Sequence, residues 1–529
     1  MVKSGKGDGD RDVERLSKEV YNVSEDRDST SDDAALPGVV TVVHKEDFEK
    51  GDSLYAKLQR FAGKYGMEQR GVERVPDDER EDVSAFKIGR MWFSVNMGVS
   101  TFALGAVAVP IFHLGYLDTI LVIIFINALG LLPVSFFSTF GPKFGLRQMM
   151  LSRFWFGYYG TKILACFQII VCMGWASVSA IVGAQLFHAV NGDMPSWTGI
   201  LIVAASTLVI CTFGHDYLHL LERYAWIPCL IIYIIVIGVF AHTGDFDNLL
   251  PMSTGPSEAA SVLSFSAAIW GFACGWAAFS ADYSVYLPAS RPTKEVFFWT
   301  FGGIYVPLVF LQGLGAAVAT AVVNQPDYLA AYLDSGIGGL LSAVLVPTLG
   351  KFGDFCVVIM ALSIIAGNCP NLYSVSFSLQ VLARKTQRVP RFIWSAAASC
   401  VCFAISVPGY DHFEAWLENF VLITGYWVSV YSAICVTDHF VFRRSYAAYK
   451  IEDFANPKAL PPGFAAIGAL VMGIVGVVLG MSQIWFTGPI SKLCGDGTNG
   501  GDVGAILGFG MSSLSYLVFR TAEKNYFRR

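Results

Sequence analysis

Two carboxamide side chains lie within an apolar run that is long enough to cross a membrane. The motif Asn368-Cys369-Pro370-Asn371 stands inside residues 355–382. Lipid cannot satisfy the donors and acceptors of an amide, and a proline removes a backbone donor and frees a carbonyl. Polar groups at this depth usually face a bundle interior or a cavity and often mark a substrate path. The motif therefore predicts a binding site for a neutral, hydrogen-bonding molecule; an interhelical amide bond at a proline kink is the alternative.

Glycines interrupt two other apolar segments at matching positions, five spans apart. The first segment carries Gly98 and Gly105, and the second carries Gly271 and Gly275. Interrupted helices in corresponding halves point to an inverted-repeat carrier whose site lies near the bilayer midplane, because unwound backbone exposes N–H and C=O groups to a cavity. These glycines and Pro370 are the predicted helix breaks. Close packing of helices at small residues is the alternative.

The elements that must position these residues are membrane-spanning helices. The chain has 529 residues, of which 54% are apolar and 15% charged, and its mean hydropathy is +0.51. This composition predicts an all-α polytopic membrane protein with about twelve spans. The matching interruptions of the first and sixth spans imply a five-plus-five inverted repeat with two further helices at the C-terminus. The expected spans are 91–112, 116–138, 161–190, 197–213, 224–242, 262–287, 297–324, 353–382, 391–407, 413–436, 463–482 and 503–520. The apolar run 336–349 is expected to form a short interfacial or re-entrant helix.

The positions of the Lys and Arg residues predict the orientation in the membrane. Odd-numbered loops contain only Lys351 and Lys492, whereas the even-numbered loops are basic. Because cytoplasmic loops carry the excess of Lys and Arg, both termini are expected in the cytoplasm. Residues 1–85 are polar and are predicted to form a cytoplasmic, largely disordered tail. The transporter domain is expected over residues 86–520, followed by a short cytoplasmic C-terminus at 521–529.

The same sequence excludes several function classes. It contains no P-loop, no nucleophile–base constellation and no Cys/His cluster with metal-ligand spacing, so neither an enzyme, a metal nor a cofactor is predicted. No basic patch with interleaved aromatic residues lies outside the membrane segments, which argues against a nucleic-acid partner. The expected partners are a small molecule, a co-transported ion and the lipid bilayer.

Five short motifs together resemble the fungal purine-cytosine permeases of the nucleobase-cation-symport-1 superfamily. They are Thr101-Phe-Ala-Leu-Gly105, Gly174-Trp175, Gly275-Trp276 with Ala281-Asp282-Tyr283, Asn368-Cys-Pro-Asn371, and Glu418-Asn419 with Gly425-Tyr426-Trp427. The resemblance extends from about residue 60 to the C-terminus. It implies the leucine-transporter-like fold, a plasma-membrane location, uptake of cytosine and purines, and coupling to protons.

The resemblance also implies roles for individual residues. Trp175 and Trp276 match the tryptophans thought to hold the base ring, and Asn371 matches the amide that hydrogen-bonds the base. A serine of the first span contributes in the family, and either Ser100 or Thr101 matches it. One turn after Trp175, where relatives often carry a carboxamide, this chain has Ser179, which leaves the hydrogen-bonding pattern open.

These residue types suit a free nucleobase. Indoles offer stacking faces worth about 1–3 kcal/mol per base, and a carboxamide can make paired donor–acceptor bonds with a base edge. The predicted substrate-binding residues are Trp175, Trp276, Asn371, Asn368, Ser100, Thr101, Ser179 and Phe272.

The coupled ion is expected to be a proton. Sodium-coupled members of the superfamily place paired hydroxyls of the eighth span on the ion, and the matching region 361–367 offers only Ser363. A sodium site needs more oxygen ligands. Asp282, Asp354 and Glu418 are candidate proton relays, with a helix-capping carboxylate as the alternative for each.

Two other functions remain open. Related fungal permeases carry pyridoxine, which is also a neutral planar heterocycle. A nutrient receptor that binds without translocating would keep the same site and could use the long N-terminal tail.

Overall fold

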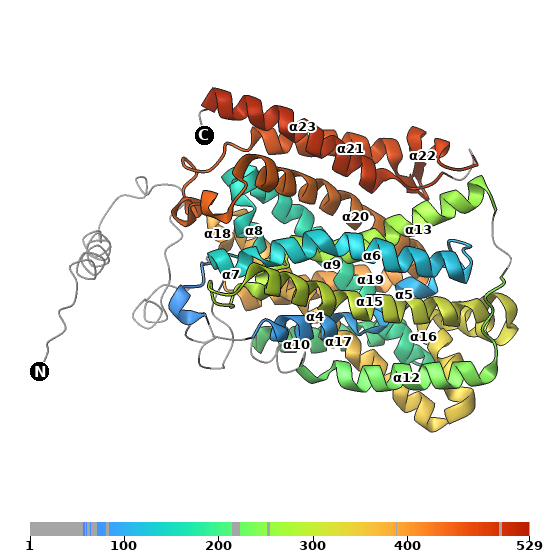
Figure 1. The fold of residues 1–529 in the computed structure, drawn as a ribbon. Helices are drawn as coiled ribbons and strands as arrows, with labels where there is room; N and C mark the ends of the chain where they lie inside the picture. Colours follow the sequence, from blue (N-terminus) through green and yellow to red (C-terminus); the bar gives the residue numbers. More distant parts are fainter. Residues whose placement is uncertain are drawn as a thin grey trace, which may run out of the picture. The chain divides into compact units, whose positions relative to one another are not determined.

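The chain folds into long helices that run side by side, as the ribbon in Figure 1 shows. The computed structural model describes residues 71–80, 84–213, 223–250, 254–387, 389–496 and 500–527, together with positions 57, 58, 60 and 64. Most of the predicted N-terminal tail therefore lies outside the described residues.

The elements in chain order are η1 (Asp77–Glu79), α4 (Phe86–Asn96), α5 (Val99–Ala106), α6 (Tyr116–Ser138), α7 (Phe140–Phe144), α8 (Gln148–Leu151), α9 (Arg153–Val190), α10 (Ser196–Phe213), α12 (Trp226–Thr243), α13 (Pro256–Cys274), η2 (Gly275–Ala278), α14 (Ala281–Ser284), α15 (Thr293–Asn324), α16 (Pro326–Leu349), α17 (Lys351–Leu382), α18 (Arg384–Gln387), α19 (Arg391–Gly409), η3 (Tyr410–His412), α20 (Phe413–Thr437), η4 (Asp438–Arg443), η5 (Tyr446–Ala448), η6 (Ile451–Ala455), α21 (Phe464–Gly480), β1 (Ser482–Gln483), β2 (Phe486–Thr487), α22 (Pro489–Leu493) and α23 (Gly504–Phe527). The antiparallel strands β1 and β2 pair Ser482 with Thr487 and Gln483 with Phe486.

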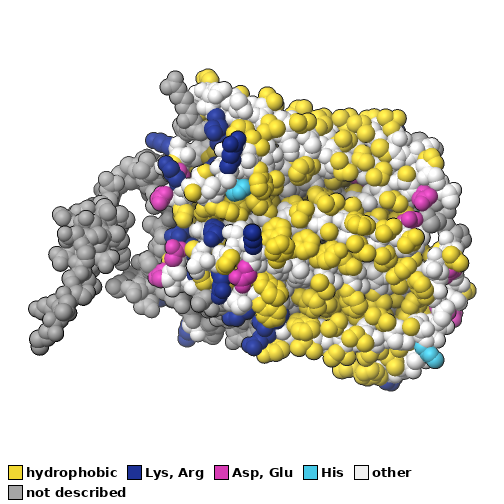
Figure 2. All heavy atoms as spheres, in the orientation of Figure 1, with side chains coloured by type: hydrophobic (Ala, Val, Ile, Leu, Met, Phe, Trp, Pro, Cys, Tyr) yellow, Lys and Arg dark blue, Asp and Glu magenta, His cyan; other side chains and the backbone are white. Residues whose placement is uncertain are grey.

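The prediction of an all-α polytopic membrane protein is confirmed. Each expected span coincides with a helix or with a broken helix, and within the described residues eight helices have the length and apolar composition to cross a membrane. Large apolar side chains such as Leu117, Phe125 and Ile170 are more than 60% exposed on the outer surface. Figure 2 shows hydrophobic side chains across most of one face of the helical body and Lys and Arg side chains gathered toward one end. A continuous apolar surface of this kind requires a lipid environment.

The first and sixth spans are interrupted. The first consists of α4 and α5, separated at Met97 and Gly98. In the sixth, α13 passes at Gly275 into the 3₁₀ turn η2, and the short helix α14 follows. These interruptions place unwound backbone in two spans of corresponding position.

Three of the predicted helix breaks are wrong. Gly105 lies inside α5, where an added Cβ would come within 1.9 Å of the Gln312 carbonyl oxygen on α15. Gly271 lies inside α13, where a Cβ would come within 2.2 Å of the Val421 carbonyl oxygen on α20. Both glycines therefore permit close helix packing. Pro370 lies within α17, which stays helical from Lys351 to Leu382.

The run 336–349 forms the second half of α16. This helix bends where Ser335 and Gly336 leave helical dihedral angles, and Gly336 has φ 55°. Past the bend, Gly339 approaches the first half so closely that a Cβ would lie 1.9 Å from the Ala331 carbonyl oxygen.

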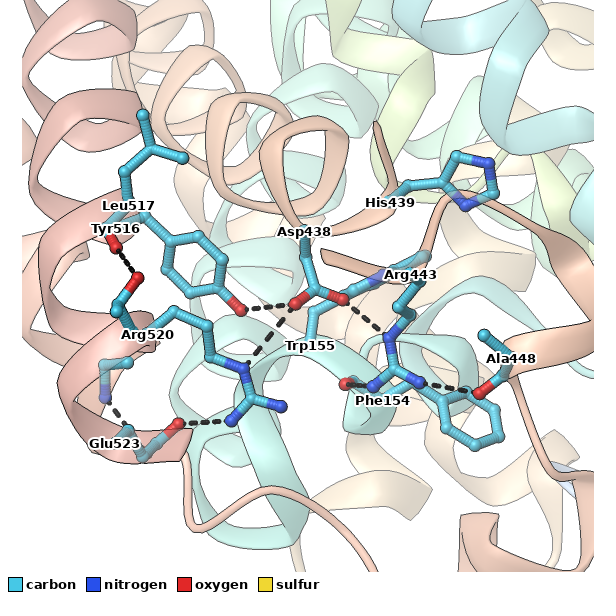
Figure 3. A network of polar contacts seen from close by, with 12 residues as sticks. Phe154, Trp155, Asp438, His439, Arg443, Ala448, Tyr516, Leu517, Arg520 and Glu523 are labelled. Carbon is cyan, nitrogen blue, oxygen red and sulfur yellow. Dashed lines mark hydrogen bonds and ion pairs between the residues drawn. The ribbon is translucent and has the colours of Figure 1, made fainter. Parts of the chain in front are cut away.

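A buried ionic network joins the end of α20 to α23 (Figure 3). Oδ2 of Asp438 lies 2.6 Å from Nε of Arg443, and its Oδ1 accepts a hydrogen bond of 2.9 Å from the Tyr516 hydroxyl and lies 3.7 Å from Nε of Arg520. Arg520 in turn pairs with Glu523 at 2.5 Å. Two carboxylates thus pair with two guanidinium groups, which offsets the free-energy cost of burying these charges.

Candidate functional site

A cavity lies where the two interrupted spans meet α9 and α17. It encloses about 580 Å³ of space between atoms, part of it open to solvent. All but one of the predicted substrate-binding residues line it, namely Trp175, Trp276, Asn371, Ser100, Thr101, Ser179 and Phe272. Gly98 and Gly275, at the two interruptions, also line it.

Packing fixes the two indoles in the cavity wall. Trp175 makes T-shaped contacts with Phe272 and Phe420, at ring centroid distances of 5.0 and 5.3 Å. Its neighbour Gly174 must be small, since a Cβ there would lie 2.0 Å from the Phe420 ring. These contacts hold the Trp175 indole in place while it remains half-buried beside the cavity.

Aromatic packing also fixes the Trp276 indole, which lies at the interruption of the sixth span. It contacts Trp92 of α4 at 5.2 Å and Phe279 at 5.3 Å, both at steep interplanar angles. Trp92 is fully buried, whereas Trp276 is half-buried and lines the cavity. A flat ligand between the two spans would therefore meet preformed indole surfaces.

Three polar side chains surround the same space. Asn371 projects from α17, and Asn96 and Thr101 flank the interruption of the first span. The Thr101 hydroxyl donates to the Asn96 carbonyl oxygen at 2.8 Å, and Nδ2 of Asn96 donates to the Trp92 carbonyl oxygen at 2.9 Å. Oδ1 of Asn96 is buried without a protein partner. A buried acceptor of this kind is costly unless a ligand or water satisfies it.

Asn368 does not line the cavity. Its Nδ2 lies 3.5 Å from the Thr207 hydroxyl of α10, and its Oδ1 lies at the same distance from Nδ2 of Asn371. The structure therefore does not bring Asn368 into the cavity wall with the other predicted substrate-binding residues. Asn368 stands behind Asn371 and connects it to α10.

None of the candidate proton relays lines the cavity either. Asp282 is buried in α14, where its Oδ1 accepts a hydrogen bond of 2.7 Å from the Gln148 backbone N–H. Asp354 lies in the first turn of α17 and pairs with the exposed Lys351 at 3.2 Å. Glu418 is half-buried in α20. The structure keeps these three acids on separate elements.

Sequence reasoning missed part of the site. Phe279 and Phe420 position the indoles, yet both stand in sequence among many other aromatic residues. Asn96 could have been singled out, because it is an amide two residues before the glycine at which the first span is interrupted. Ser363 lines the cavity with its hydroxyl bonded to the Met360 carbonyl oxygen at 2.7 Å. Among the described residues, no group of three or more His, Cys, Asp or Glu side chains could hold a metal ion.

The fold has relatives of known structure. The inward-facing conformation of Mhp1 superposes with a TM-score of 0.66 at 14% sequence identity and covers 87% of this chain and 96% of its own. This likeness supports the five-plus-five arrangement with two C-terminal helices.

Curated relatives are more similar in sequence. The purine-cytosine permease fcyB of Emericella nidulans is 50% identical over 500 residues, which are 94% of this chain and 96% of the relative. The purine-cytosine permease FCY2 of Saccharomyces cerevisiae is 40% identical over 89% of both chains, and the vitamin B6 transporter TPN1 of the same yeast is 26% identical over 90% of both. The family model described as "Permease for cytosine/purines, uracil, thiamine, allantoin" matches residues 74–489. The chain belongs to this permease family.

Proposed function

We propose that this protein is a secondary active transporter that imports cytosine and purine bases by proton symport through alternating access. The observation that carries the proposal is that Trp175, Trp276 and Asn371 line one cavity at two helix interruptions. The names of the 50% and 40% identical relatives support the same substrate class, because both are purine-cytosine permeases.

The proposed binding mode follows from the chemistry of the cavity wall. No residue of the wall carries a charge, which suits a neutral base better than an ionised substrate. The base stacks against the indoles of Trp175 and Trp276, and Asn371 pairs with its edge. The unpartnered Oδ1 of Asn96 accepts a hydrogen bond from a ring N–H or an exocyclic amine. The hydroxyls of Ser100, Thr101 and Ser179 complete the polar lining.

The proposed coupling to protons rests on how few oxygen ligands the side chains of the eighth span supply to the cavity. Ser363 supplies one hydroxyl to the cavity, and this hydroxyl is already bonded to the Met360 carbonyl oxygen. Sodium needs several oxygen ligands at once, so we favour the proton.

The proposed setting is the plasma membrane, with both termini in the cytoplasm. Figure 1 shows α7, α8 and α18, which belong to even-numbered loops, toward the end where Figure 2 shows the Lys and Arg side chains. The positive-inside rule predicts that this end faces the cytoplasm. The hairpin β1–β2 and α22 lie at the opposite end in Figure 1 and would face outward.

Uptake of labelled cytosine by cells that lack their own base permeases tests the proposal. Saturable uptake that adenine, guanine or hypoxanthine compete away, and that rises when the external pH is lowered, is expected. Transport of pyridoxine without saturable uptake of cytosine would reassign the substrate. Nutrient signalling retained without any transport would identify a receptor.

A further inference from the structure

A buried carboxylate outside the cavity joins three elements at the end opposite the basic loops. Asp502 lies in the loop before α23 and is 2% exposed. Its Oδ2 accepts hydrogen bonds from the Tyr426 hydroxyl of α20 and, at 2.8 Å, from the Ser482 backbone N–H of β1. Its backbone N–H donates to the Ser264 hydroxyl of α13 at 3.2 Å. One residue thus ties α13, α20 and the hairpin together.

Asp502 has no cationic partner in the part of the chain that the structure describes. Within the described residues, no Lys, Arg or His side chain forms an ion pair with it. The titratable groups that face it both belong to α20: the Tyr426 phenol donates to it, and the Glu418 carboxyl acts on it as a like charge. The elements α13 and β1 face it with a serine hydroxyl and a backbone amide. The donors that the structure describes around a negative charge at this position are therefore all neutral.

The surroundings of Asp502 are apolar on the remaining side. It lines a cavity with about 780 Å³ of space between atoms, bounded by α6, α13 and α23, whose other lining residues include Leu129, Trp270 and Ile506. Burial is the largest influence on the carboxyl and raises the pKa of Asp502 to about 6, against the hydrogen bonds from Ser482, Tyr426 and Gly504, which lower it. The charged and the neutral form are thus close in free energy near this pH.

One of the elements that Asp502 joins, α13, lines the substrate cavity with Phe272, and α20 supports the cavity wall from behind through Phe420. Along α20, Phe420 contacts the Trp175 ring, and Tyr426 follows six residues later, about 9 Å along the helix. Along α13, Ser264 is followed by Phe272, and η2 then carries Trp276. A change in the hydrogen bonds of Asp502 therefore acts on the two helices that position the indoles.

We propose that Asp502 is a proton-binding site whose occupancy favours binding of the base, an inference that rests on the proposed proton symport. A proton from the external medium adds to a carboxylate oxygen, which cancels the negative charge and removes the acceptor that Tyr426 prefers. The contact between α20 and the loop before α23 then loosens, and α20 adjusts against Trp175. Release of the proton restores the carboxylate.

Equilibrium binding of labelled cytosine to the purified protein, measured from pH 5.5 to 8, where cytosine stays neutral, and without a membrane, separates this site from the transmembrane gradient. For the wild type, affinity is expected to fall as the pH rises through about 6, by up to tenfold per pH unit, because one proton is linked to binding. Asp502→Asn mimics the neutral acid and should bind cytosine with the same affinity at every pH. Asp411→Asn, which changes an exposed acid just before α20, is the matched control and should keep the wild-type profile.

A second variant keeps the test decisive if Asp502→Asn does not fold. Tyr426→Phe removes the donor that stabilises the charged form, so it raises the pKa of Asp502 and should move the profile toward higher pH. An unshifted profile in Tyr426→Phe, an unchanged profile in a folded Asp502→Asn, or a flat wild-type profile would each overturn the inference. Absence of cytosine binding by the wild type at any pH would instead refute the proposed function.

Discussion

Nδ2 of Asn371 lies 3.5 Å from Oδ1 of Asn368, one turn apart on α17, and only Asn371 reaches the cavity. The two amides of one motif therefore have different surroundings. Asn368 extends toward the Thr207 hydroxyl of α10, so it connects α17 to its neighbour. Substitutions at these two positions should have separable effects.

Asn371→Ala should weaken cytosine binding and leave the fold intact. A paired donor–acceptor contact with a base contributes about 1–3 kcal/mol, which corresponds to a roughly fivefold to 150-fold rise in Kd. Binding of labelled cytosine to the purified variant measures this rise. Asn368→Ala is the comparison and should mainly lower the midpoint of thermal unfolding. Equal losses of affinity in the two variants would contradict the division of roles.

Trp276→Ala should abolish measurable uptake while the protein still reaches the cell surface. The substitution removes a stacking surface worth about 1–3 kcal/mol and also leaves Trp92 and Phe279 without their partner. Initial rates of cytosine uptake, normalised to surface protein, give the result. Trp197→Ala changes a half-exposed indole on α10 and serves as the control. Near-normal apparent affinity in Trp276→Ala would remove this residue from the site.

Gly271→Ala should destabilise the protein far more than Gly98→Ala. An added Cβ at Gly271 would lie 2.2 Å from the Val421 carbonyl oxygen, whereas at Gly98 the nearest atom would be 4.0 Å away. Forcing a methyl group into a packed contact costs about 1–3 kcal/mol. Thermal unfolding of the two purified variants in the same detergent measures the difference. A lower midpoint for Gly98→Ala than for Gly271→Ala would refute this account of the glycines.

Asp438→Asn should destabilise the junction of α20 and α23. The carboxylate is 1% exposed and faces both Arg443 and Arg520, so its neutralisation leaves a buried excess of positive charge. Removing one partner of a buried pair costs about 3–5 kcal/mol. The midpoint of thermal unfolding should fall clearly, and Asp411→Asn, an exposed acid, should leave it near the wild-type value. An unchanged midpoint in Asp438→Asn would mean that the network does not stabilise the protein.

The sequence allowed the spans and most of the cavity wall to be predicted, because both depend on local composition. Membrane length makes a helix visible in the chain, and an amide or indole inside such a helix is conspicuous. The resemblance to known permeases supplied Trp175 and Trp276.

The errors arose where a distant element decides what a residue does. Gly98 and Gly105 look alike in sequence, yet Gly105 packs against Gln312 on α15, more than 200 positions away, while a Cβ on Gly98 would have no atom nearer than 4.0 Å. Asn368 and Asn371 look alike in the motif, and only the fold shows that Asn368 contacts Thr207 while Asn371 lines the cavity. Asp502 lies in a short polar loop, and only folding brings its carboxylate within hydrogen-bonding distance of the Tyr426 hydroxyl.

The direct contact of α13 with α20 restricts how this protein can open. At Gly271 and Gly425 the two backbones meet with no side chain between them, since a Cβ on Gly425 would lie 3.0 Å from the Gly271 Cα. Sliding or twisting one helix against the other would drive a carbonyl oxygen into a main-chain carbon. The two helices should therefore move together as a rigid pair. The opening that admits a base should form on the opposite side of the substrate cavity, where α17 contributes side chains that can change rotamer.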